Sequence, residues 1–345
     1  MYAQAEATNE TAKLEKIIVS ALTNKEYNAE LTKYASKENV IILALTDSSF
    51  LDMAFNFYET SIVKFNIKNY LFIGSDHQAC EKLNAKHINC YVYMTDSNAN
   101  KLSIFNTKEF NRKMNIRTFF ILDALILGFT ILHTDVDVVF FSNPLEDLYS
   151  SEFRNLACLS DDGFCNAGFI YLKSSEFTID IYIRMKHTAM KIEIPDQTAL
   201  NNELKAAVIK NNTTFSNFSQ IQILDDKQYQ NGRKYFLRGH RFYYDSATCP
   251  QCIVVHNNWI ISKEAKRYMF REVLLWYYDE NGYYSNPTTK YLMYSNVHVP
   301  YNRRVTINSS NIELDALKTA LYLGHVLNRV FLLLFCFIYN KTNKK

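Results

Sequence analysis

Short apolar runs that end in turn-forming polar residues recur through the first half of the chain, separated by stretches with apolar side chains at helical spacing. The runs cover residues 40–46 (VIILALT), 70–74 (YLFIG), 88–93 and 130–134 (TILHT). The helical stretches cover residues 50–63, 78–85 and 108–127. Bounded apolar runs of this length indicate buried strands. Strands that alternate with helices pair in parallel within a sheet covered on both faces, so we expect an α/β fold with a Rossmann-like sheet.

The second half of the chain has a more mixed pattern. Strands are predicted at residues 156–160, 168–172, 220–224 and 252–256, with a polar loop at 161–166 between the first two. Helices are predicted to begin at Ser174 and to cover residues 196–209 and 262–278. Ligands of such sheets bind beyond the carboxyl ends of the strands. Asp47, Asp76 and Asp135 each follow a strand directly, so we expect them at that edge.

Three segments are expected along the chain: a polar, helical segment at 1–36, a main domain at 37–305, and a C-terminal extension at 306–345. Residues 330–339 (VFLLLFCFIY) form the most apolar run. As a helix they would span about 15 Å, half of a bilayer core of about 30 Å. A buried core element is therefore favoured over a tail anchor, and membrane association stays open. Residues 1–16 are polar, so no signal peptide or N-terminal anchor is predicted.

Composition narrows the class of protein. The chain has 345 residues, of which 48% are hydrophobic and 21% charged, and this balance is typical of a folded globular protein. With only 8 Gly and 5 Pro, collagen-like and Pro-rich architectures are excluded. The formal net charge is +3, and basic residues cluster only at the C-terminus. Nucleic acid is therefore not expected as a partner.

Six of the seven cysteines fall into pairs that are close in sequence: 80 and 90, 158 and 165, and 249 and 252. Such pairs can form disulfides in an oxidising compartment, and Cys336 is left over. The Cys-x-x-Cys at 249–252 is also compatible with zinc or redox chemistry, although no second pair follows at matching spacing. These features permit a secretory location.

Asp135 and Asp137 are the strongest candidates for chemistry. Residues two apart on an extended strand point to the same face, and two carboxylates in an apolar setting require a neutralising cation. Oxygen ligands favour Mg²⁺ or Mn²⁺, with substrate phosphates completing the shell. An acid-x-acid triplet alone is weak evidence for a metal site, and a solvated turn with two acidic residues is the alternative. The apolar strand before the pair and the VVFF run after it favour the metal site.

Three further motifs offer polar groups that could join this site. In CNAGF, Gly168 allows a close backbone approach and the Asn166 amide can bind a polyol; an ordinary turn is the alternative. Asp196 and Gln197 open a helix, where an aspartate is often only a cap. His256 ends an apolar strand and is followed by two asparagines, although a lone histidine is more often structural. Two carboxylates and one imidazole would leave metal positions open for two phosphate oxygens.

Together these motifs resemble the nucleotide-diphospho-sugar transferase family, specifically family-77 glycosyltransferases with the GT-A fold. The resemblance is carried by NVIILALTDSSFLDMAFNF (39–57), NYLFIGSD (69–76), LGFTILHTDVDVVFFSNPL (127–145), CNAGFIYLKS (165–174), DQTALNNEL (196–204) and VHNNWIISKEAKRYMFREVLLW (255–276). It implies a GT-A Rossmann-like mixed sheet with helices on both faces. Residues 316–337 resemble the start of a C-terminal module of plant-type arabinosyltransferases and xylosyltransferase-like members, so a short, truncated helical extension is expected.

The resemblance also implies an activity: transfer of a sugar from a UDP-sugar to a glycan or glycoprotein acceptor, with retention of anomeric configuration. Mn²⁺ or Mg²⁺ would be bound by Asp135, Asp137 and His256, with Asp135 also contacting the ribose. A Golgi or secretory lumen is the location that the family implies. The donor sugar stays open between galactose, xylose and arabinose, and the acceptor is undetermined.

The same resemblance assigns roles in the donor pocket. Asp196 and Gln197 are the candidates that face the anomeric carbon. The other assignments are the nucleoside pocket for Thr46 and Asp76, the diphosphate for Arg117, and the donor sugar for Asn166 and Gly168, with Asp161 and Asp162 nearby.

Two rival functions remain open at this point. ILHTDVDVVFF resembles the DxDx[TV] signature of haloacid-dehalogenase-type phosphatases, in which the first aspartate, here Asp135, is the nucleophile. That signature ends the first strand of the phosphatase fold, whereas three predicted strands precede it here. The other rival is a catalytically degenerate homologue that binds a UDP-sugar without turning it over.

Overall fold

The computed structural model describes residues 19–93, 108–150, 154–191, 194–215, 217–238, 249–279, 288, 290–294 and 307–333. The chain divides into two compact units, Met1–Arg267 and Tyr268–Lys345. The candidate site lies wholly within the first unit.

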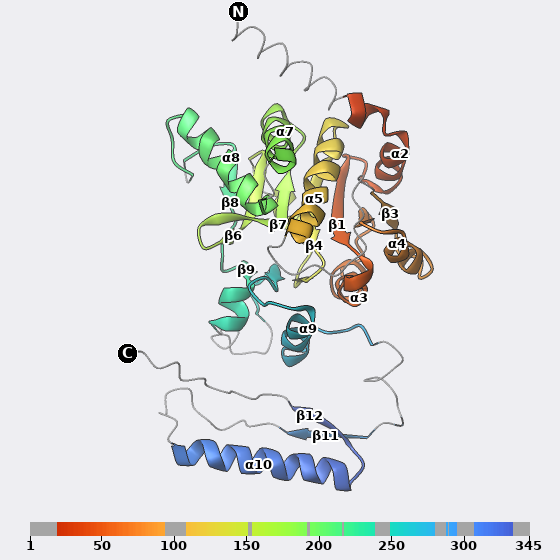
Figure 1. The fold of residues 1–345 in the computed structure, drawn as a ribbon, viewed down its shortest axis with the longest axis vertical. Coiled ribbons are helices and arrows are strands. Elements are labelled where there is room, and N and C mark those ends of the chain that lie inside the picture. The colour runs from red at the N-terminus through yellow and green to blue at the C-terminus, as the bar shows by residue number, and fades with distance from the viewer. Residues whose placement is uncertain are drawn as a thin grey trace, which may run out of the picture. The chain divides into compact units, whose positions relative to one another are not determined.

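A seven-stranded mixed sheet forms the centre of the first unit, in the order β3-β2-β1-β4-β7-β6-β8 (Figure 1). Its strands are β1 (Val40–Thr46), β2 (Tyr70–Gly74), β3 (Cys90–Val92), β4 (Thr130–Asp135), β6 (Leu156–Asp161), β7 (Phe164–Leu172) and β8 (Ile221–Ile223). β1 pairs in parallel with β2 and β4, and β7 is antiparallel to β4 and β6. The predicted α/β class and mixed sheet are confirmed.

Side chains alternate between the two faces of this sheet, and different elements cover each face. Four helices contribute to the core on one face: α2 (Lys25–Tyr34), α5 (Lys108–Ile126), α7 (Glu176–Lys191) and α8 (Asp196–Lys210). On the other face lies α3 (Leu51–Phe57), whose Phe57 packs edge-on against Phe72 of β2 at 6.0 Å. α4 (His77–Asn84) packs beside β2 and β3. Helices therefore cover both faces, as predicted.

A second, three-stranded sheet was not predicted. It consists of β5 (Val138–Phe140), β9 (Tyr229–Asn231) and β10 (Val254–His256), with β10 in the centre. Three-residue strands are too short to show a period in the sequence, and β9 is largely polar. The strand predicted at 252–256 thus lies outside the main sheet, and it pairs antiparallel with β5, the segment that follows the two aspartates.

Several predicted boundaries differ from the observed ones. The helix expected at 50–63 consists of a 3₁₀ turn (Ser48–Phe50), α3 and a π-helical turn (Tyr58–Val63). The π-helical turn contains Ser61, whose Oγ accepts a hydrogen bond from the Phe140 amide at 3.1 Å. The strand at 88–93 is limited to β3. The helix expected at 262–278 is α9 (Lys263–Glu272) and stops before Leu274, whose φ of 58° is left-handed.

The polar loop expected at 161–166 is a tight turn between β6 and β7. Asp162 and Gly163 are its two central residues, with φ values of 51° and 90°. An Asp-Gly pair with positive φ at both positions is a preferred two-residue hairpin turn. Asn166 therefore lies within β7 rather than in a loop, and its position is fixed by strand pairing. The first unit also contains α6 (Pro144–Ser150) and a π-helical turn at Arg233–Leu237.

The second unit contains α10 (Ile307–Val326) and a parallel pair of strands, β11 (Tyr291–Tyr294) and β12 (Val330–Leu333). The expected helical extension is thus a helix followed by a strand, because the first four residues of the apolar run 330–339 are extended. Residues 334–339 lie outside the described residues. Among the helices that the structure describes, none has the length and apolar character needed to cross a membrane.

All three predicted cysteine pairs are disulfides: Cys80–Cys90, Cys158–Cys165 and Cys249–Cys252. The first joins α4 to β3, and the second joins the paired strands β6 and β7. Since Cys249 and Cys252 are bonded to each other, the zinc alternative for this motif is wrong. Cys336 lies outside the described residues.

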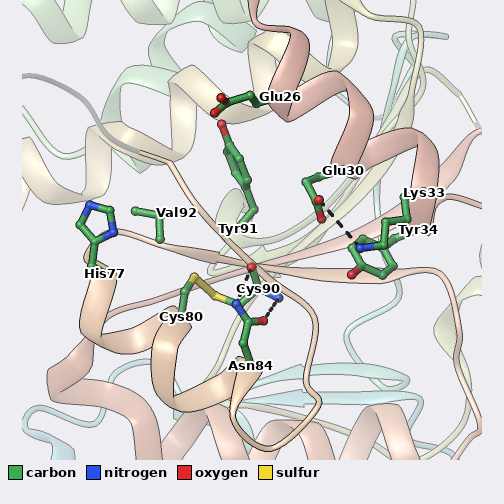
Figure 2. Close-up of a pocket in the computed structure, with 10 residues that line it drawn as sticks. All are labelled: Glu26, Glu30, Lys33, Tyr34, His77, Cys80, Asn84, Cys90, Tyr91 and Val92. Carbon is green, nitrogen blue, oxygen red and sulfur yellow. Dashed lines mark hydrogen bonds and ion pairs between the residues drawn. A yellow bond between two sulfur atoms is a disulfide. The ribbon is translucent and has the colours of Figure 1, made fainter.

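A hollow of about 500 Å³ lies beside β3, which is the edge strand of the main sheet opposite β8 (Figure 2). It is lined by α2, α4 and β3, and its walls include Glu30, Lys33, Tyr91 and the Cys80–Cys90 disulfide. All of the predicted site residues are described, and none of them lines this hollow. The candidate chemistry is therefore elsewhere.

Candidate functional site

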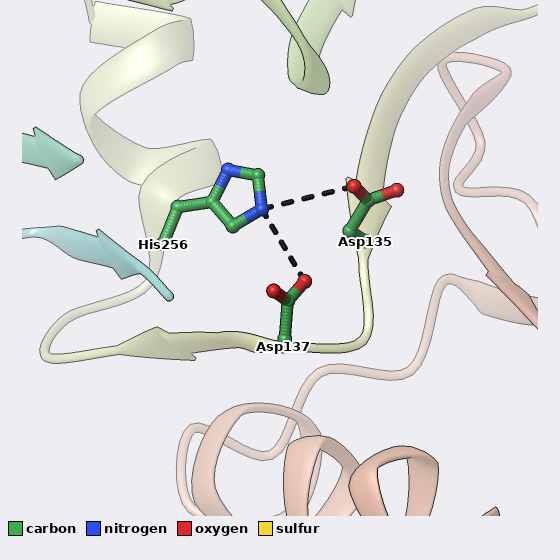
Figure 3. Close-up of side chains that lie close together, drawn as sticks. All are labelled: Asp135, Asp137 and His256. Atoms are coloured by element: carbon green, nitrogen blue, oxygen red, sulfur yellow. Dashed lines mark ion pairs between the residues drawn. The ribbon is translucent and has the colours of Figure 1, made fainter. Parts of the chain in front are cut away.

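Asp135, Asp137 and His256 converge on one point (Figure 3). The Nε2 atom of His256 lies 3.3 Å from Oδ1 of Asp137 and 3.7 Å from Oδ2 of Asp135. One potential ligand atom from each residue lies within 4.8 Å of the others. The structure therefore brings together the three residues that the sequence assigned to a metal.

The two sheets produce this convergence. Asp135 is the last residue of β4, and β5 begins directly after Asp137. His256 pairs with Val138 across β5 and β10, and the amide of Asn257 donates to the carbonyl of Asp137 at 2.8 Å. The register of the small sheet thus fixes the imidazole beside the second aspartate, although the two are 119 positions apart (256 − 137).

Gly168 of β7 makes room for the cluster. A Cβ atom at this position would lie 2.3 Å from Oδ2 of Asp135 and 2.6 Å from Cε1 of His256. Neither distance is compatible with a real side chain, so only glycine lets these two groups approach each other here. The sequence predicted that Gly168 lets a ligand approach the backbone closely, and this stays a prediction; the structure shows that Asp135 and His256 come close to this position.

The donor set fits a divalent cation. Two carboxylates and an imidazole offer two hard oxygens and one nitrogen, a combination that suits Mn²⁺ and also admits Mg²⁺. Nε2 of His256 faces the carboxylates, and Nδ1 is buried without a hydrogen-bond partner among the described residues. Three protein ligands leave further coordination positions for phosphate oxygens.

Arg117 of α5 connects the first aspartate to the start of α8. Its Nη1 donates to Oδ1 of Asp135 at 2.8 Å and to the carbonyl of Ala167 at 3.1 Å, and its Nε lies 2.7 Å from Oδ2 of Asp196. Burial lowers the pKa of Arg117, but the carboxylates of Asp135 and Asp196 raise it by more, so the net shift is upward. The guanidinium therefore stays charged and holds both carboxylates in place.

The carboxyl groups of Asp135 and Asp137 both have pKa values below the usual range of an aspartate. Burial raises the pKa of Asp135, but Arg117, His133 and His256 outweigh burial and bring that pKa down to about 2. Burial acts in the same direction on Asp137, whose pKa is nevertheless held well below its usual range by Lys266 and His256. The cluster is therefore ready to receive a cation without losing a carboxyl proton.

Two residues that lie at this site were not predicted from the sequence. Lys266 of α9 places Nζ 2.5 Å from Oδ2 of Asp137 and also donates to the carbonyl of Asn257 at 2.6 Å. His133 is fully buried on β4, where burial lowers its pKa, and Nδ1 donates to the carbonyl of Leu43 at 3.0 Å. The signal for His133 was its position two residues before Asp135, on the same face of the strand. Lys266 had no comparable signal.

The predicted donor-sugar residues form a hydrogen-bonded network around Asp161. Nε2 of Gln197 donates to Oδ2 of Asp161 at 2.9 Å, and Nδ2 of Asn166 lies 3.5 Å from the same oxygen. Oε1 of Gln197 accepts from the Ala167 amide at 3.3 Å, and Oδ1 of Asn166 accepts from the Gly168 amide at 2.8 Å. The network is thus continuous with the metal cluster through β7.

The remaining predicted residues lie at separate positions. Thr46 ends β1 one residue beyond Leu45, which pairs with Asp135, so it shares the carboxyl edge of the sheet. Asp76 caps α4: Oδ1 accepts from the Ala79 amide and Oδ2 from the Ser48 amide, each at 2.8 Å. Its role in a nucleoside pocket stays a prediction. Asp162 is in the hairpin turn and forms an ion pair with Arg233.

Comparison with known proteins gives the family. The model of the nucleotide-diphospho-sugar transferase family matches residues 66–270, which include the metal cluster and its neighbours. The chain belongs to this family. Its mixed sheet with helices on both faces is the GT-A arrangement that the sequence resemblance implied.

Individual relatives are distant. The UDP-galactose:fucoside alpha-3-galactosyltransferase of Dictyostelium discoideum is 26% identical over 293 residues, covering 71% of this chain and 44% of that protein. The beta-arabinofuranosyltransferase RAY1 of Arabidopsis thaliana is 24% identical over 274 residues, covering 71% of this chain and 49% of that protein. The chain therefore spans about half the length of these relatives. The apo glycosyltransferase GlyE of Streptococcus pneumoniae TIGR4 is 16% identical, with a TM-score of 0.43 and coverage of 70% of this chain and 61% of that one.

Proposed function

We propose that this chain is a metal-dependent glycosyltransferase that moves a sugar from a UDP-sugar to a glycan or glycoprotein acceptor with retention of anomeric configuration. The observation that carries the proposal is the convergence of Asp135, Asp137 and His256 at the carboxyl edge of β4, where open α/β sheets bind their ligands. Family membership supports the nucleotide-sugar donor.

The cluster would hold Mn²⁺ or Mg²⁺ through two carboxylates and Nε2 of His256. When bound, such an ion neutralises the charge that develops on a departing diphosphate. Lys266 adds a second positive charge next to Asp137, so it is placed to contact a phosphate oxygen. Arg117 binds two carboxylates instead, and we assign it to positioning Asp135 and Asp196 rather than to the diphosphate.

The donor-sugar side of the site supports transfer without a protein nucleophile. Asp196 is buried and paired with Arg117, and the Gln197 amide is bonded at both ends. In the proposed reaction the bond between the anomeric carbon and the phosphate oxygen breaks. The acceptor oxygen bonds to the anomeric carbon on the same face and gives its proton to the departing phosphate. Asp196 and Gln197 would shape the space around that carbon.

The names of two relatives suggest where to begin with substrates. The Dictyostelium discoideum protein is named for a fucoside, and an Arabidopsis thaliana relative, UDP-D-xylose:L-fucose alpha-1,3-D-xylosyltransferase 3, is 22% identical over 281 residues. We propose a fucose-containing glycan as the first acceptor to test, with UDP-galactose, UDP-xylose and UDP-arabinose as donors. Three disulfides favour an oxidising compartment such as the Golgi lumen.

The direct test is release of UDP from these donors in the presence and absence of Mn²⁺. We expect metal-dependent release that Asp137→Asn reduces by about 100-fold or more. Asp180→Asn is the matched control, because Asp180 is an exposed residue of α7 paired with Arg184. Hydrolysis of a generic phosphoester without UDP release would support the phosphatase alternative. UDP-sugar binding without turnover would support the degenerate homologue.

A further inference from the structure

We propose that the indole of Trp259 is the platform on which the acceptor sugar stacks. This inference rests on the proposed function and extends it to the acceptor side of the same site. Trp259 follows His256 by three residues, and its side chain reaches the Asp161 network that the sequence assigned to the donor sugar. It is the most exposed member of that network.

The indole is fixed although it is exposed to solvent. Trp259 is 48% exposed, yet its Nε1 donates to Oδ1 of Asp161 at 2.6 Å. The guanidinium of Arg233 lies over the ring, 4.9 Å from the centroid, and Arg233 is in turn paired with Asp162 in the neighbouring hairpin turn. The hydrogen bond to Asp161 and the contact with Arg233 thus hold the indole in one orientation, although its large apolar surface is exposed to solvent.

The backbone supports the same orientation. Trp259 has a φ of 65°, in the left-handed region that bulky residues rarely adopt. Such conformations persist where surrounding contacts enforce them, and they cluster at functional sites. Asn258, the preceding residue, is held against Gly232. Its Oδ1 accepts a hydrogen bond from the Gly232 amide at 2.7 Å, and a Cβ at Gly232 would lie 2.0 Å from the Asn258 carbonyl oxygen.

The two oxygens of Asp161 separate a buried side from an exposed side. Oδ2 faces Gln197 and Asn166, and Asn166 is only 2% exposed. Oδ1 faces Trp259. A donor sugar attached to a diphosphate at the metal cluster belongs on the buried side, whereas an acceptor arrives from solvent. Arg233 lies over one face of the indole, so the acceptor ring would stack on the opposite face. An aromatic face with polar groups at its edge matches the apolar C–H face and peripheral hydroxyls of a pyranose ring.

Kinetics with p-nitrophenyl glycosides of fucose, galactose, xylose and arabinose as acceptors tests the platform. For Trp259→Ala we expect the KM of the best acceptor to rise by about tenfold or more, with kcat and acceptor-free UDP-sugar hydrolysis falling far less. Trp259→Phe should recover most of the affinity. Trp276→Phe, at the chain's other tryptophan, is the matched control. Equal loss of hydrolysis and transfer in Trp259→Ala would overturn the platform.

A second measurement does not require turnover. In the Trp276→Phe variant, Trp259 is the single tryptophan, so its emission can be followed while methyl glycosides of the same four sugars are added. A saturable change with one of them supports the platform, and no change with any of them contradicts it. Absence of metal-dependent UDP release from the wild-type chain would count against the proposed function alone, because this emission measurement is independent of it.

Discussion

His256 pairs with Val138 across the small sheet, one residue beyond Asp137. This register places the imidazole 3.3 Å from the Asp137 carboxylate, and the antiparallel pairing of β4 with β7 brings Gly168 beneath both groups. The convergence of these three side chains is therefore a consequence of strand register in two sheets. A slip of one residue in β10 would turn His256 to the opposite face.

Gly168→Ala should disable the cluster without unfolding the protein. The added methyl group would enter the space between Asp135 and His256, so one of these ligands must move. We expect Mn²⁺-dependent UDP release to fall by about tenfold or more, with a corresponding loss of Mn²⁺ affinity. Gly163→Asn is the control, because no atom lies within 4 Å of a Cβ at Gly163, so this substitution strains only the hairpin turn and does not enter the cluster. Equal effects of the two substitutions would contradict this assignment.

Lys266→Met should weaken diphosphate binding. Methionine keeps the length of the side chain and removes the charge next to Asp137. We expect the affinity for UDP with Mn²⁺ to fall by about tenfold, or about 1.4 kcal/mol, as measured by calorimetric titration. Lys318→Met, at an exposed position on α10, should bind UDP like the wild type. Unchanged UDP affinity in Lys266→Met would show that this lysine serves only to hold Asp137.

The depressed pKa of Asp135 predicts a specific dependence of stability on pH. The pKa of Asp135 is lowered to about 2 in the folded chain, whereas the pKa of an unfolded aspartate is about 3.9. The stabilisation is therefore present above the unfolded pKa and is lost as pH falls towards the folded pKa. Denaturant unfolding of wild type and Asp135→Asn in the presence of chelator should differ by roughly 2 kcal/mol at neutral pH, and this difference should shrink between about pH 4 and pH 2. A pH-independent difference would contradict the prediction.

The Cys80–Cys90 disulfide should contribute to stability and not to catalysis. It closes a sequence separation of 10 residues at the β3 edge, and it lines the hollow beside β3 rather than the metal cluster. The double variant Cys80→Ser/Cys90→Ser should lose about 2–3 kcal/mol of unfolding free energy. Near-normal UDP release below its melting temperature is expected. A selective loss of UDP release in a folded double variant would indicate that the edge of the sheet acts on the site.

Sequence patterns located the elements that have a clear period or sharp boundaries. β1 and β2 were predicted to the residue, since each is a fully buried, largely apolar run closed by a polar turn. The strand at 252–256 was predicted and is β10, but β5 and β9 were missed because they are three residues long and only tertiary pairing defines them. The convergence of Asp135 and His256 was nevertheless anticipated, because each ends an apolar strand.

Contacts between side chains that are far apart in the sequence could not be predicted from the sequence. Lys266 lies in a segment whose sequence predicts a helix, and Trp259 lies just before that helix. No spacing rule connects Lys266 to Asp137 or Trp259 to Asp161. Arg117 was expected to approach the diphosphate. Its position between Asp135 and Asp196 depends on how α5 packs against β4 and α8, which a single sequence does not encode as a local signal.

Calorimetric titration of Mn²⁺ into the metal-free protein, with UDP present at a fixed concentration, tests the central claim most directly. One ion should bind per chain in the wild type, and binding should be lost in both Asp137→Asn and His256→Ala while Asp180→Asn binds normally. Equal Mn²⁺ binding by all four proteins would show that these side chains do not form a metal site.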